Sequence, residues 1–342
     1  MNARRASTLC FVVPALDGPV SGGTLYNQGL CAALAQSSIR VLISELGAAG
    51  LGAALDAADQ VWVDSLYLAA LPDLVRQKPG RVGLLAHYLP SFVSCGRAVQ
   101  AEELSIEEAR ALSCADSFLV TSEFMREAFE PLVAPQKPIF VALPASHAEL
   151  ARVPPEPSLG LRALIIGNVV PGKGLEPLLH SLSELLDAGD HFELSVVGSL
   201  TLDAAYAARC LRIIADSRSL AGRVTLIGAC SPGQTAALLS EAELLVSASR
   251  MESFGMALAE ARVTGIPILA CAGGNARAHV AVEAGGQLVE SAAALAAACV
   301  GLARDPASLR RRIGQARREA LPARSWTETA RTLLDQLASR EK

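Results

Sequence analysis

Residues 244–260 read LLVSASRMESFGMALAE, and this stretch joins a strand signal to a helix signal. Its first four residues form a short, mostly apolar run that is typical of a buried strand. We expect the helix to begin near Ser253, which leaves the backbone N–H groups of Ser253, Phe254 and Gly255 without helical partners. A strand, a glycine-containing loop and a helix in this order form the repeating unit of a parallel α/β sheet.

The same unit recurs along the whole chain. Further β-rich runs lie at 9–13, 41–44, 60–63, 82–85, 118–121 and 139–143 in the first half, and at 163–166, 194–197, 224–227 and 267–270 in the second half. Helix-like stretches such as 25–35 and 102–113 separate them. This alternation predicts parallel sheets covered by helices, and such sheets bind ligands outside the carboxyl ends of their strands.

A proline-rich segment divides the chain. Seven of the 18 prolines lie between residues 131 and 157, and residues 153–160, VPPEPSLG, can continue neither a helix nor a central strand. We therefore predict one Rossmann-like domain over 1–152 and a second over 161–322. The predicted fold class is α/β, with two Rossmann-like parallel-sheet domains facing across a cleft.

Composition excludes several classes of protein. The 342 residues are 51% apolar and 19% charged, which suits a large packed core and excludes a disordered chain. The net charge of −4 and an aromatic content of 4% argue against a nucleic-acid partner. No apolar run has the roughly 18 residues that a membrane span needs, so we expect no stable membrane insertion. Residues 1–150 carry 10 basic and 15 acidic residues, a net −5, and therefore lack the basic face that favours anionic lipid.

Cysteine usage indicates the compartment. The eight cysteines are scattered, and no two have C-x-x-C spacing. In a chain of this length that pattern predicts reduced thiols in the cytoplasm rather than a disulfide framework or a zinc site. The N-terminus also lacks the long apolar segment of a secretory signal.

Several familiar catalytic motifs are incomplete. Residues 167–174, GNVVPGKG, nearly match the P-loop, but Gly174 replaces the hydroxyl residue that holds Mg²⁺. No G-x-S-x-G elbow is present, and no Asp-x-Asp pair offers the usual metal clamp of a nucleotide-sugar enzyme. The histidines lack metal-ligand spacing, so we predict no metal site. A structural role is expected for His147, His180, His191 and His279.

Two glycine-rich segments follow predicted strands. In residues 18–24, GPVSGGT, Gly22 and Gly23 allow a ligand to approach the backbone closely at a helix start; the alternative is a simple tight turn. In residues 167–174, Lys173 is one of only four lysines and lies at a predicted helix start. A cation beside helix N–H groups suits a phosphate, whereas the alternative is a solvated surface lysine.

Two glutamates bracket the helix start of the opening stretch. Glu252 lies just before the predicted helix and Glu260 about two turns inside it, so eight residues at ~1.5 Å each place them roughly 12 Å apart along the axis. At that separation they do not form one acid/base pair. They suit the two ends of an extended ligand whose anionic middle rests on the helix N-terminus; the alternative is a helix cap and a solvated face.

These residues carry a family resemblance. Residues 228–274, with Glu252-x7-Glu260 and the following Gly265-Ile-Pro-Ile-Leu-Ala inside them, resemble the retaining glycosyltransferases of family four, which have the GT-B fold. The 167–174 segment, the early Ser-Gly-Gly loop and the Ser-Trp pair that opens the last helix agree with this resemblance. It implies an acceptor-side domain over 1–152, a donor-side domain over 161–322 and a last helix within 323–342 that packs back towards the first domain.

The resemblance also implies an activity and roles for residues. Members move a sugar from a nucleotide-diphosphate donor to an acceptor, with retention of configuration and without a metal or other cofactor. By position, Glu260 holds the ribose and Glu252 the hydroxyls of the donor sugar. Lys173 and the N–H groups of 253–256, from Ser253 to Met256, hold the diphosphate. His87, at the end of a first-domain strand, lies near the donor sugar, and Gly22 and Gly23 face the phosphates or the acceptor.

One position departs from the pattern. Members commonly have arginine or lysine where Asn168 stands, so this chain has one cation fewer near the diphosphate. Arg250, Arg277 or another basic group compensates, or the leaving group is stabilised less. Two alternatives stay open: a noncatalytic nucleotide-sugar-binding or assembly protein with the same fold, and a phosphorylase-like or sugar-phosphate-synthase activity. The sequence leaves the base, the sugar and the acceptor undetermined.

Overall fold

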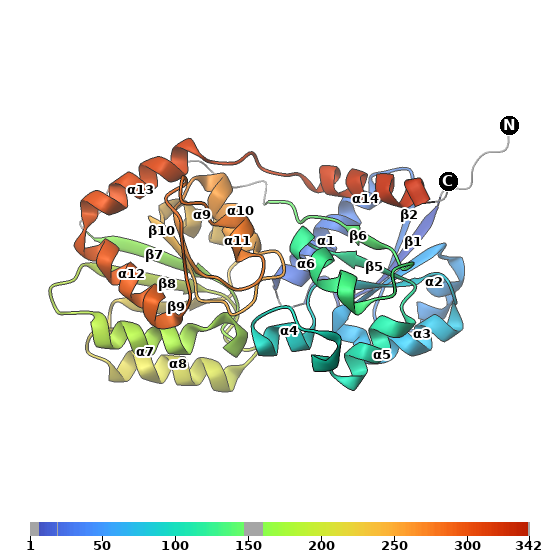
Figure 1. The fold of residues 1–342 in the computed structure, drawn as a ribbon, viewed down its shortest axis with the longest axis horizontal. Helices are drawn as coiled ribbons and strands as arrows, with labels where there is room; N and C mark the ends of the chain where they lie inside the picture. The colour runs from blue at the N-terminus through green and yellow to red at the C-terminus, as the bar shows by residue number, and fades with distance from the viewer. Residues whose placement is uncertain (1–6, 19, 147–159, 341–342) are drawn as a thin grey trace. The chain divides into compact units, whose positions relative to one another are not determined.

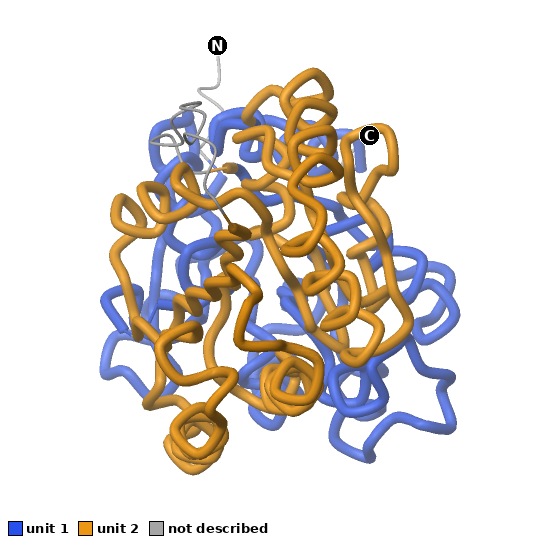
Figure 2. The backbone as a smooth tube through the Cα atoms, turned by 90° about the vertical axis from the view of Figure 1, so that its left-hand side faces the viewer, with its two compact units in different colours: residues 1–145, 324–342 blue, residues 146–323 orange. Residues whose placement is uncertain are grey.

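The structure is a computed structural model, and it describes residues 7–18, 20–146 and 160–340. The chain divides into two compact units, drawn in different colours in Figure 2. Unit 1 contains residues 1–145 together with 324–342, and unit 2 contains residues 146–323. The expected linker at 153–160 lies outside the described residues except for its last glycine, and His147 also lies outside them.

The described part of unit 1 contains one six-stranded parallel sheet with the order β2-β1-β3-β4-β5-β6 (Figure 1). Its strands are β1 (Thr8–Val12), β2 (Arg40–Ser44), β3 (Gln60–Asp64), β4 (Val82–Ala86), β5 (Ser117–Val120) and β6 (Ile139–Val141). Strands β1, β4 and β5 are buried over their whole length, as expected for a sheet covered on both faces. All carboxyl ends of the strands therefore point to one edge of the sheet.

The helices of unit 1 lie between its strands, and one further helix returns from the C-terminus. They are α1 (Gly22–Ala35), α2 (Leu51–Ala57), α3 (Leu71–Gln77), α4 (Pro90–Cys95), α5 (Ile106–Cys114), α6 (Glu123–Phe129) and α14 (Trp326–Arg340), with short 3-10 turns η1 (Ser65–Ala70), η2 (Ala101–Glu103) and η3 (Glu130–Leu132). Helix α14 packs on α1, where the Trp326 ring meets Tyr26 edge to face with centroids 5.6 Å apart. The side chain of Gln336 bonds both the N–H and the C=O of Val141, at 3.0 and 2.7 Å, and so extends the edge of the sheet.

Unit 2 contains a second six-stranded parallel sheet among its described residues, with the order β12-β11-β10-β7-β8-β9. Its strands are β7 (Leu161–Ile166), β8 (Phe192–Val197), β9 (Val224–Gly228), β10 (Leu244–Ser247), β11 (Ile268–Cys271) and β12 (Gln287–Val289). Its helices are η4 (Pro171–Lys173), α7 (Leu175–Leu185), α8 (Ala204–Asp216), α9 (Pro232–Glu241), α10 (Met256–Thr264), α11 (Ala276–His279), α12 (Ala292–Arg304) and α13 (Pro306–Arg318). Two apolar clusters, one on each side of this sheet's central strands, form its core.

The α/β class with two Rossmann-like parallel sheets is confirmed, because every predicted β-rich run overlaps a strand. The short edge strand Gln287–Val289 was not predicted. The expected helix start near Ser253 is wrong: α10 begins at Met256, after Gly255 at φ +90°. Among the described residues, no single helix is both long and apolar enough to cross a bilayer; α12 and α13 reach that length only together, and they meet at a 104° bend.

Candidate functional site

The glycine-rich segment after β7 is held tightly against the end of β10. Gly174 has φ +68°, and a Cβ there would come within 2.1 Å of the Ala248 carbonyl oxygen, so only glycine fits. The N–H of Arg250 also donates to the Gly172 carbonyl at 3.0 Å. The Lys173 side chain runs across Gly167, where a Cβ would lie 3.5 Å from its methylenes. These contacts bring the segment beside the loop that leads into α10.

Lys173 and Glu252 meet where these two loops touch. The Lys173 Nζ lies 2.6 Å from Glu252 Oε1, and the two side chains are 34% and 15% exposed. The pair lies outside the carboxyl ends of β7 and β10, where parallel sheets bind ligands. An ammonium group has three donor hydrogens, so Lys173 can keep its contact with Glu252 and donate to a further anion.

The start of α10 presents unpartnered N–H groups beside this pair. Gly255 is the N-cap residue, and no side chain caps the helix. Within the described residues, the N–H groups of Gly255, Met256, Ala257 and Leu258 have no hydrogen-bond acceptor. A left-handed residue followed by right-handed helix forms a concave set of N–H groups that suits an anion.

The two predicted glutamates do not lie along one helix axis as expected. Because α10 begins at Met256, Glu260 lies in its second turn and Glu252 lies in the preceding loop, so the estimate of roughly 12 Å along one axis does not apply. Glu260 is 7% exposed, which rules out a solvated outer face. Both carboxylates are thus partly or fully withdrawn from solvent.

A second loop, after β11, supports the loop that contains Glu252. Glu252 forms an isolated bridge with Gly274, and its carbonyl accepts the N–H of Asn275 at 2.7 Å. The carbonyl of Phe254 contacts two side chains, Asn275 Nδ2 at 2.7 Å and His279 Nε2 at 2.6 Å. Asn275 was not predicted as a site residue, and the structural role expected for His279 takes this form.

Asn168 has a contact of its own within unit 2. Its side-chain oxygen accepts the N–H of Ser199 at 2.8 Å, which ties the loop after β7 to the loop after β8. Gly198 makes this approach possible, because a Cβ there would lie 2.1 Å from the Gly167 carbonyl oxygen. The amide oxygen of Asn168 is therefore engaged in holding the loops together.

In unit 1, His87 follows β4 and belongs to a buried polar network. Its Nε2 lies 3.0 Å from Asn27 Oδ1 and 3.4 Å from Asp64 Oδ2. Asn27 in turn donates from Nδ2 to Asp64 Oδ2 at 2.8 Å. Since Asn27 donates through nitrogen, its oxygen is an acceptor, and His87 must carry a proton on Nε2. Neither Asn27 nor Asp64 was predicted; the available signal was an acidic residue at the carboxyl end of a strand.

Asp64 is a buried carboxylate stabilised by donors. Burial by itself disfavours its ionised form, but the contacts with His87, the N–H of Leu66 at 2.9 Å and Asn27 outweigh it and lower the pKa of Asp64. The carboxylate is 1% exposed. It therefore holds His87 and Asn27 in place as a fixed negative charge.

Gly22 and Gly23 are the first two residues of α1. The preceding Ser21 caps the helix, with its hydroxyl accepting the N–H of Thr24 at 3.0 Å. A Cβ on Gly23 would lie 3.4 Å from the His87 ring, so the glycine allows the ring to approach the helix start. The predicted residues thus gather into one group in unit 1 and a second group in unit 2.

A comparison with protein families matches the part of the chain that contains the unit 2 group. The profile of the family described as "Glycosyl transferases group 1" matches residues 149–320, half of the chain. The chain belongs to the glycosyl transferases group 1 family. The matched residues of this group 1 glycosyl transferase include Lys173, Glu252, Glu260 and all of α10.

Curated relatives of this group 1 glycosyl transferase bear one name. D-inositol 3-phosphate glycosyltransferase of Segniliparus rotundus is 31% identical over 147 residues, which are 43% of this chain and 32% of the relative. The enzyme of the same name from Corynebacterium efficiens is 28% identical over 212 residues, which are 59% of this chain and 49% of the relative. The matches thus span half or less of the length of these relatives.

Solved structures share the fold. Sucrose-phosphate synthase from Thermosynechococcus elongatus superposes with a TM-score of 0.74 at 20% identity, covering 98% of this chain and 99% of that one. The Anabaena protein HepE, in complex with UDP-glucose, superposes with a TM-score of 0.73 at 16% identity, covering 97% and 99%. These neighbours confirm the GT-B fold of the group 1 chain.

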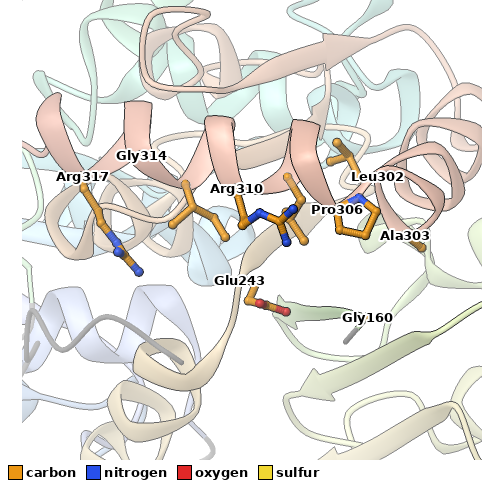
Figure 3. Close-up of a pocket in the computed structure, with 10 residues that line it drawn as sticks. Gly160, Glu243, Leu302, Ala303, Pro306, Arg310, Gly314 and Arg317 are labelled. Atoms are coloured by element: carbon orange, nitrogen blue, oxygen red, sulfur yellow. The ribbon is translucent and has the colours of Figure 1, made fainter. Parts of the chain in front are cut away.

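A pocket elsewhere in unit 2 contains none of the predicted residues. It has a volume of about 220 Å³, and Figure 3 shows Arg310 and Arg317 of α13 on one side and Glu243 and Gly160 on the other. Glu243 directly precedes β10 and Gly160 directly precedes β7. The pocket therefore lies at the amino ends of these strands, on the edge opposite to the Lys173–Glu252 pair.

The described residues contain no group of three or more His, Cys, Asp or Glu side chains placed to hold a metal ion. All eight cysteines are free thiols, and four of them are buried. Burial raises the pKa of Cys10 to about 11 and the pKa of Cys31 to about 12, so these two thiols are protonated at neutral pH.

Proposed function

We propose that this chain transfers a sugar from a nucleotide-diphosphate sugar to an acceptor hydroxyl, with retention of configuration and without a metal. One observation carries the proposal: the Lys173–Glu252 pair adjoins the uncapped start of α10, outside the carboxyl ends of a parallel sheet. This arrangement offers a cation and several N–H donors to a diphosphate, and a carboxylate to the hydroxyls of a sugar. Family membership supports the same reaction class.

The chemistry follows from where charge develops. As the bond between sugar and phosphate breaks, negative charge grows on the departing nucleoside diphosphate. Lys173 and the N–H groups from Gly255 to Leu258 are already oriented before the reaction, so they stabilise this charge without reorganisation. The acceptor oxygen attacks the face of the sugar that the diphosphate leaves, and its proton passes to a phosphate oxygen of the leaving group. No carboxylate has to act as a nucleophile, in contrast to retaining glycosidases.

The residue roles in unit 2 follow the same layout. Glu260, nearly buried in the second turn of α10, is assigned to the ribose hydroxyls, and Glu252 to the hydroxyls of the transferred sugar. Asn168 is assigned to the edge of the diphosphate site, although its side-chain oxygen already holds Ser199. In unit 1, His87 is assigned to the donor sugar and Gly22 and Gly23 to the phosphates or the acceptor.

The first experiment is a screen of nucleotide sugars for thermal stabilisation, because a ligand that binds the native state raises its stability. UDP-glucose is the first donor to test, since a structural neighbour binds it. The second experiment follows release of nucleoside diphosphate from the stabilising donor, with and without a panel of hydroxyl acceptors. Activity should survive EDTA; abolition by EDTA with restoration by Mn²⁺ or Mg²⁺ would contradict the metal-independent mechanism.

A second candidate is a noncatalytic nucleotide-sugar-binding protein. The position of Asn168 favours it, because this residue adds no cation to the site and its oxygen is taken by Ser199. The release assay separates the two functions: a binding protein is stabilised by the donor but never converts it. We also place the chain in the cytoplasm, on the strength of its eight free cysteines.

A further inference from the structure

The turn that leads into α10 is held by two side chains from another element. Asn275 and His279, which begin and end the short segment at α11, both contact the carbonyl oxygen of Phe254. The two residues are 7% and 9% exposed. The His279 ring also meets the Phe254 ring edge to face, with centroids 4.9 Å apart. Neither side chain belongs to the residue roles assigned above.

The hydrogen-bond pattern determines which nitrogen of His279 carries a proton. Its Nε2 is 2.6 Å from the Phe254 carbonyl oxygen, which is an acceptor only. If Nε2 lacked a proton, two acceptors would stand at hydrogen-bond distance with no hydrogen between them. Nε2 is therefore a donor, and its 3.3 Å contact with Asn275 Nδ2 is the approach of two donors that share one oxygen. Burial lowers the pKa of His279, against the bond to Phe254 and the charge of Glu252, so the ring is neutral near pH 7.

Holding this carbonyl also orients the N–H group on the other side of the same peptide. The chain has no cis peptide among its described residues, so the Phe254 C=O and the Gly255 N–H point in opposite directions. With the oxygen bound to Asn275 and His279, the Gly255 N–H points away from them and has no acceptor in the described part of the chain. Gly255 has φ +90°, and a Cβ there would lie 3.3 Å from the His279 ring, so the turn and the ring are fitted to each other.

We infer that Asn275 and His279 are positioning residues of the donor site: by binding the Phe254 carbonyl they aim the Gly255 N–H, and with it the start of α10, at the diphosphate. The inference rests on the proposed function. Both side chains act through the Phe254 carbonyl and not by touching the donor. The neutral imidazole of His279 and the side-chain amide of Asn275 each donate a hydrogen bond to this one oxygen.

The test compares two substitutions of His279 with a matched control. His279→Phe keeps a ring against Phe254 but removes the donor, whereas His279→Gln keeps a donor near the Nε2 position. His180→Phe makes the same replacement at an exposed histidine of unit 2. Calorimetry measures binding of UDP, GDP and ADP to the wild type, and the one that binds most tightly is the first probe. The second probe is its parent nucleoside, which has no phosphate. Binding of the nucleoside is measured by the shift in the thermal unfolding temperature. Thermal unfolding without ligand measures the cost to the fold.

We expect His279→Phe to weaken the nucleoside diphosphate about tenfold, the effect of one misdirected hydrogen bond at about 1.4 kcal/mol per factor of ten. Nucleoside binding should stay unchanged, His279→Gln should recover affinity to within threefold, and His180→Phe should match the wild type. Asn275→Ala should weaken the diphosphate in the same direction. Equal affinity of His279→Phe and the wild type would overturn the inference and leave the proposed function intact. Equal loss of nucleoside and diphosphate, with no recovery in His279→Gln, would show a structural role only. A wild type that binds none of the three diphosphates would overturn the proposed function itself.

Discussion

The starts of α1 and α10 are both glycine-containing helix N-termini that follow a parallel strand, yet they offer a ligand different chemistry. At α10 the N-cap is Gly255, no side chain caps the helix, and the Lys173 cation adjoins the preceding loop. At α1 the Ser21 hydroxyl already accepts one N–H group. Near this helix start, the His87 ring contacts a carboxylate instead of a cation, because the buried Asp64 lies 3.4 Å from its Nε2.

This difference separates two kinds of binding. The α10 site presents positive charge and N–H groups that have no acceptor among the described residues, which suits the anionic leaving group proposed above. The α1 site presents the His87 imidazole and the N–H groups of Gly22 and Gly23, which have no acceptor among the described residues, and these groups suit the hydroxyls of a sugar. A parallel sheet thus supplies the same geometric place in both units, and the side chains that follow the strands decide what binds there.

The largest expected effect is on the cation of the α10 site. Lys173→Ala should lower kcat by roughly 10²- to 10³-fold, the usual cost of removing one preorganised group that stabilises developing charge. Lys173→Arg should recover part of the rate, because the guanidinium group restores the positive charge but is planar and larger than the ammonium group. Lys137→Ala, at a lysine of unit 1 that contacts backbone carbonyls, is the control. Steady-state kinetics with the donor varied measure the effect. An unchanged kcat in Lys173→Ala would show that the cation does not set the α10 site apart from the α1 site.

Substitutions of the two glutamates of the α10 region should affect different kinetic constants. Glu252→Gln should lower kcat by about 10- to 150-fold, because a charge-assisted hydrogen bond worth roughly 1.5–3 kcal/mol gains strength as the sugar becomes cationic. Glu260→Gln should mainly raise the donor KM, because the ribose does not change during the reaction. Both variants are compared at saturating acceptor. A loss of kcat only in Glu260→Gln, with a loss of donor affinity only in Glu252→Gln, would reverse the two assignments.

In unit 1, Asp64→Asn tests the buried carboxylate behind His87. Its pKa is lowered in the folded state, so it contributes stability above the unfolded pKa of about 4 that is lost as the pH falls through the folded pKa. The wild type should therefore lose more stability than Asp64→Asn between pH 5 and pH 3. At pH 7 the variant should be less stable by roughly 1–3 kcal/mol, the cost of leaving buried donors without their acceptor. Denaturant unfolding across this pH range measures both, with Asp56→Asn, at an exposed position, as the control; parallel pH curves for wild type and Asp64→Asn would contradict the network.

The smallest expected effect is at the cap of α1. Ser21→Ala should reduce the stability of the chain by about 1 kcal/mol, because the Thr24 N–H loses its acceptor, whereas Ser21→Gly should cost only a few tenths. The donor KM should change little, since the α10 site is assigned to the diphosphate. A large rise in donor KM in Ser21→Ala, with little loss of stability, would show that α1 also binds the phosphates.

The sequence was sufficient for the features that are local. Mostly apolar runs of four or five residues between helix-like stretches predicted eleven strands, because burial of a parallel strand on both faces requires such a run. Lys173, Glu252 and Glu260 were candidates from spacing and resemblance alone. The β12 strand was missed because three residues with two of them half-exposed carry almost no strand signal; pairing with β11 makes it a strand.

Tertiary contacts decided the rest. The start of α10 lies three residues later than expected because Asn275 and His279 hold the preceding peptide, and no local pattern encodes a contact across 21 to 25 residues. Asp64, His87 and Asn27 meet because the sheet order places β3 beside β4 and α1 over their carboxyl ends.

Gly29 shows the same division most plainly. In the sequence it is an unfavourable residue in the middle of a helix. In the structure a Cβ at this position would lie 2.1 Å from the Trp326 ring, which arrives from the far end of the chain with α14. The sequence alone determined that α1 is a helix. Only the packing of a ring nearly 300 residues away decided that one of its positions must have no side chain, because two groups cannot occupy the same volume.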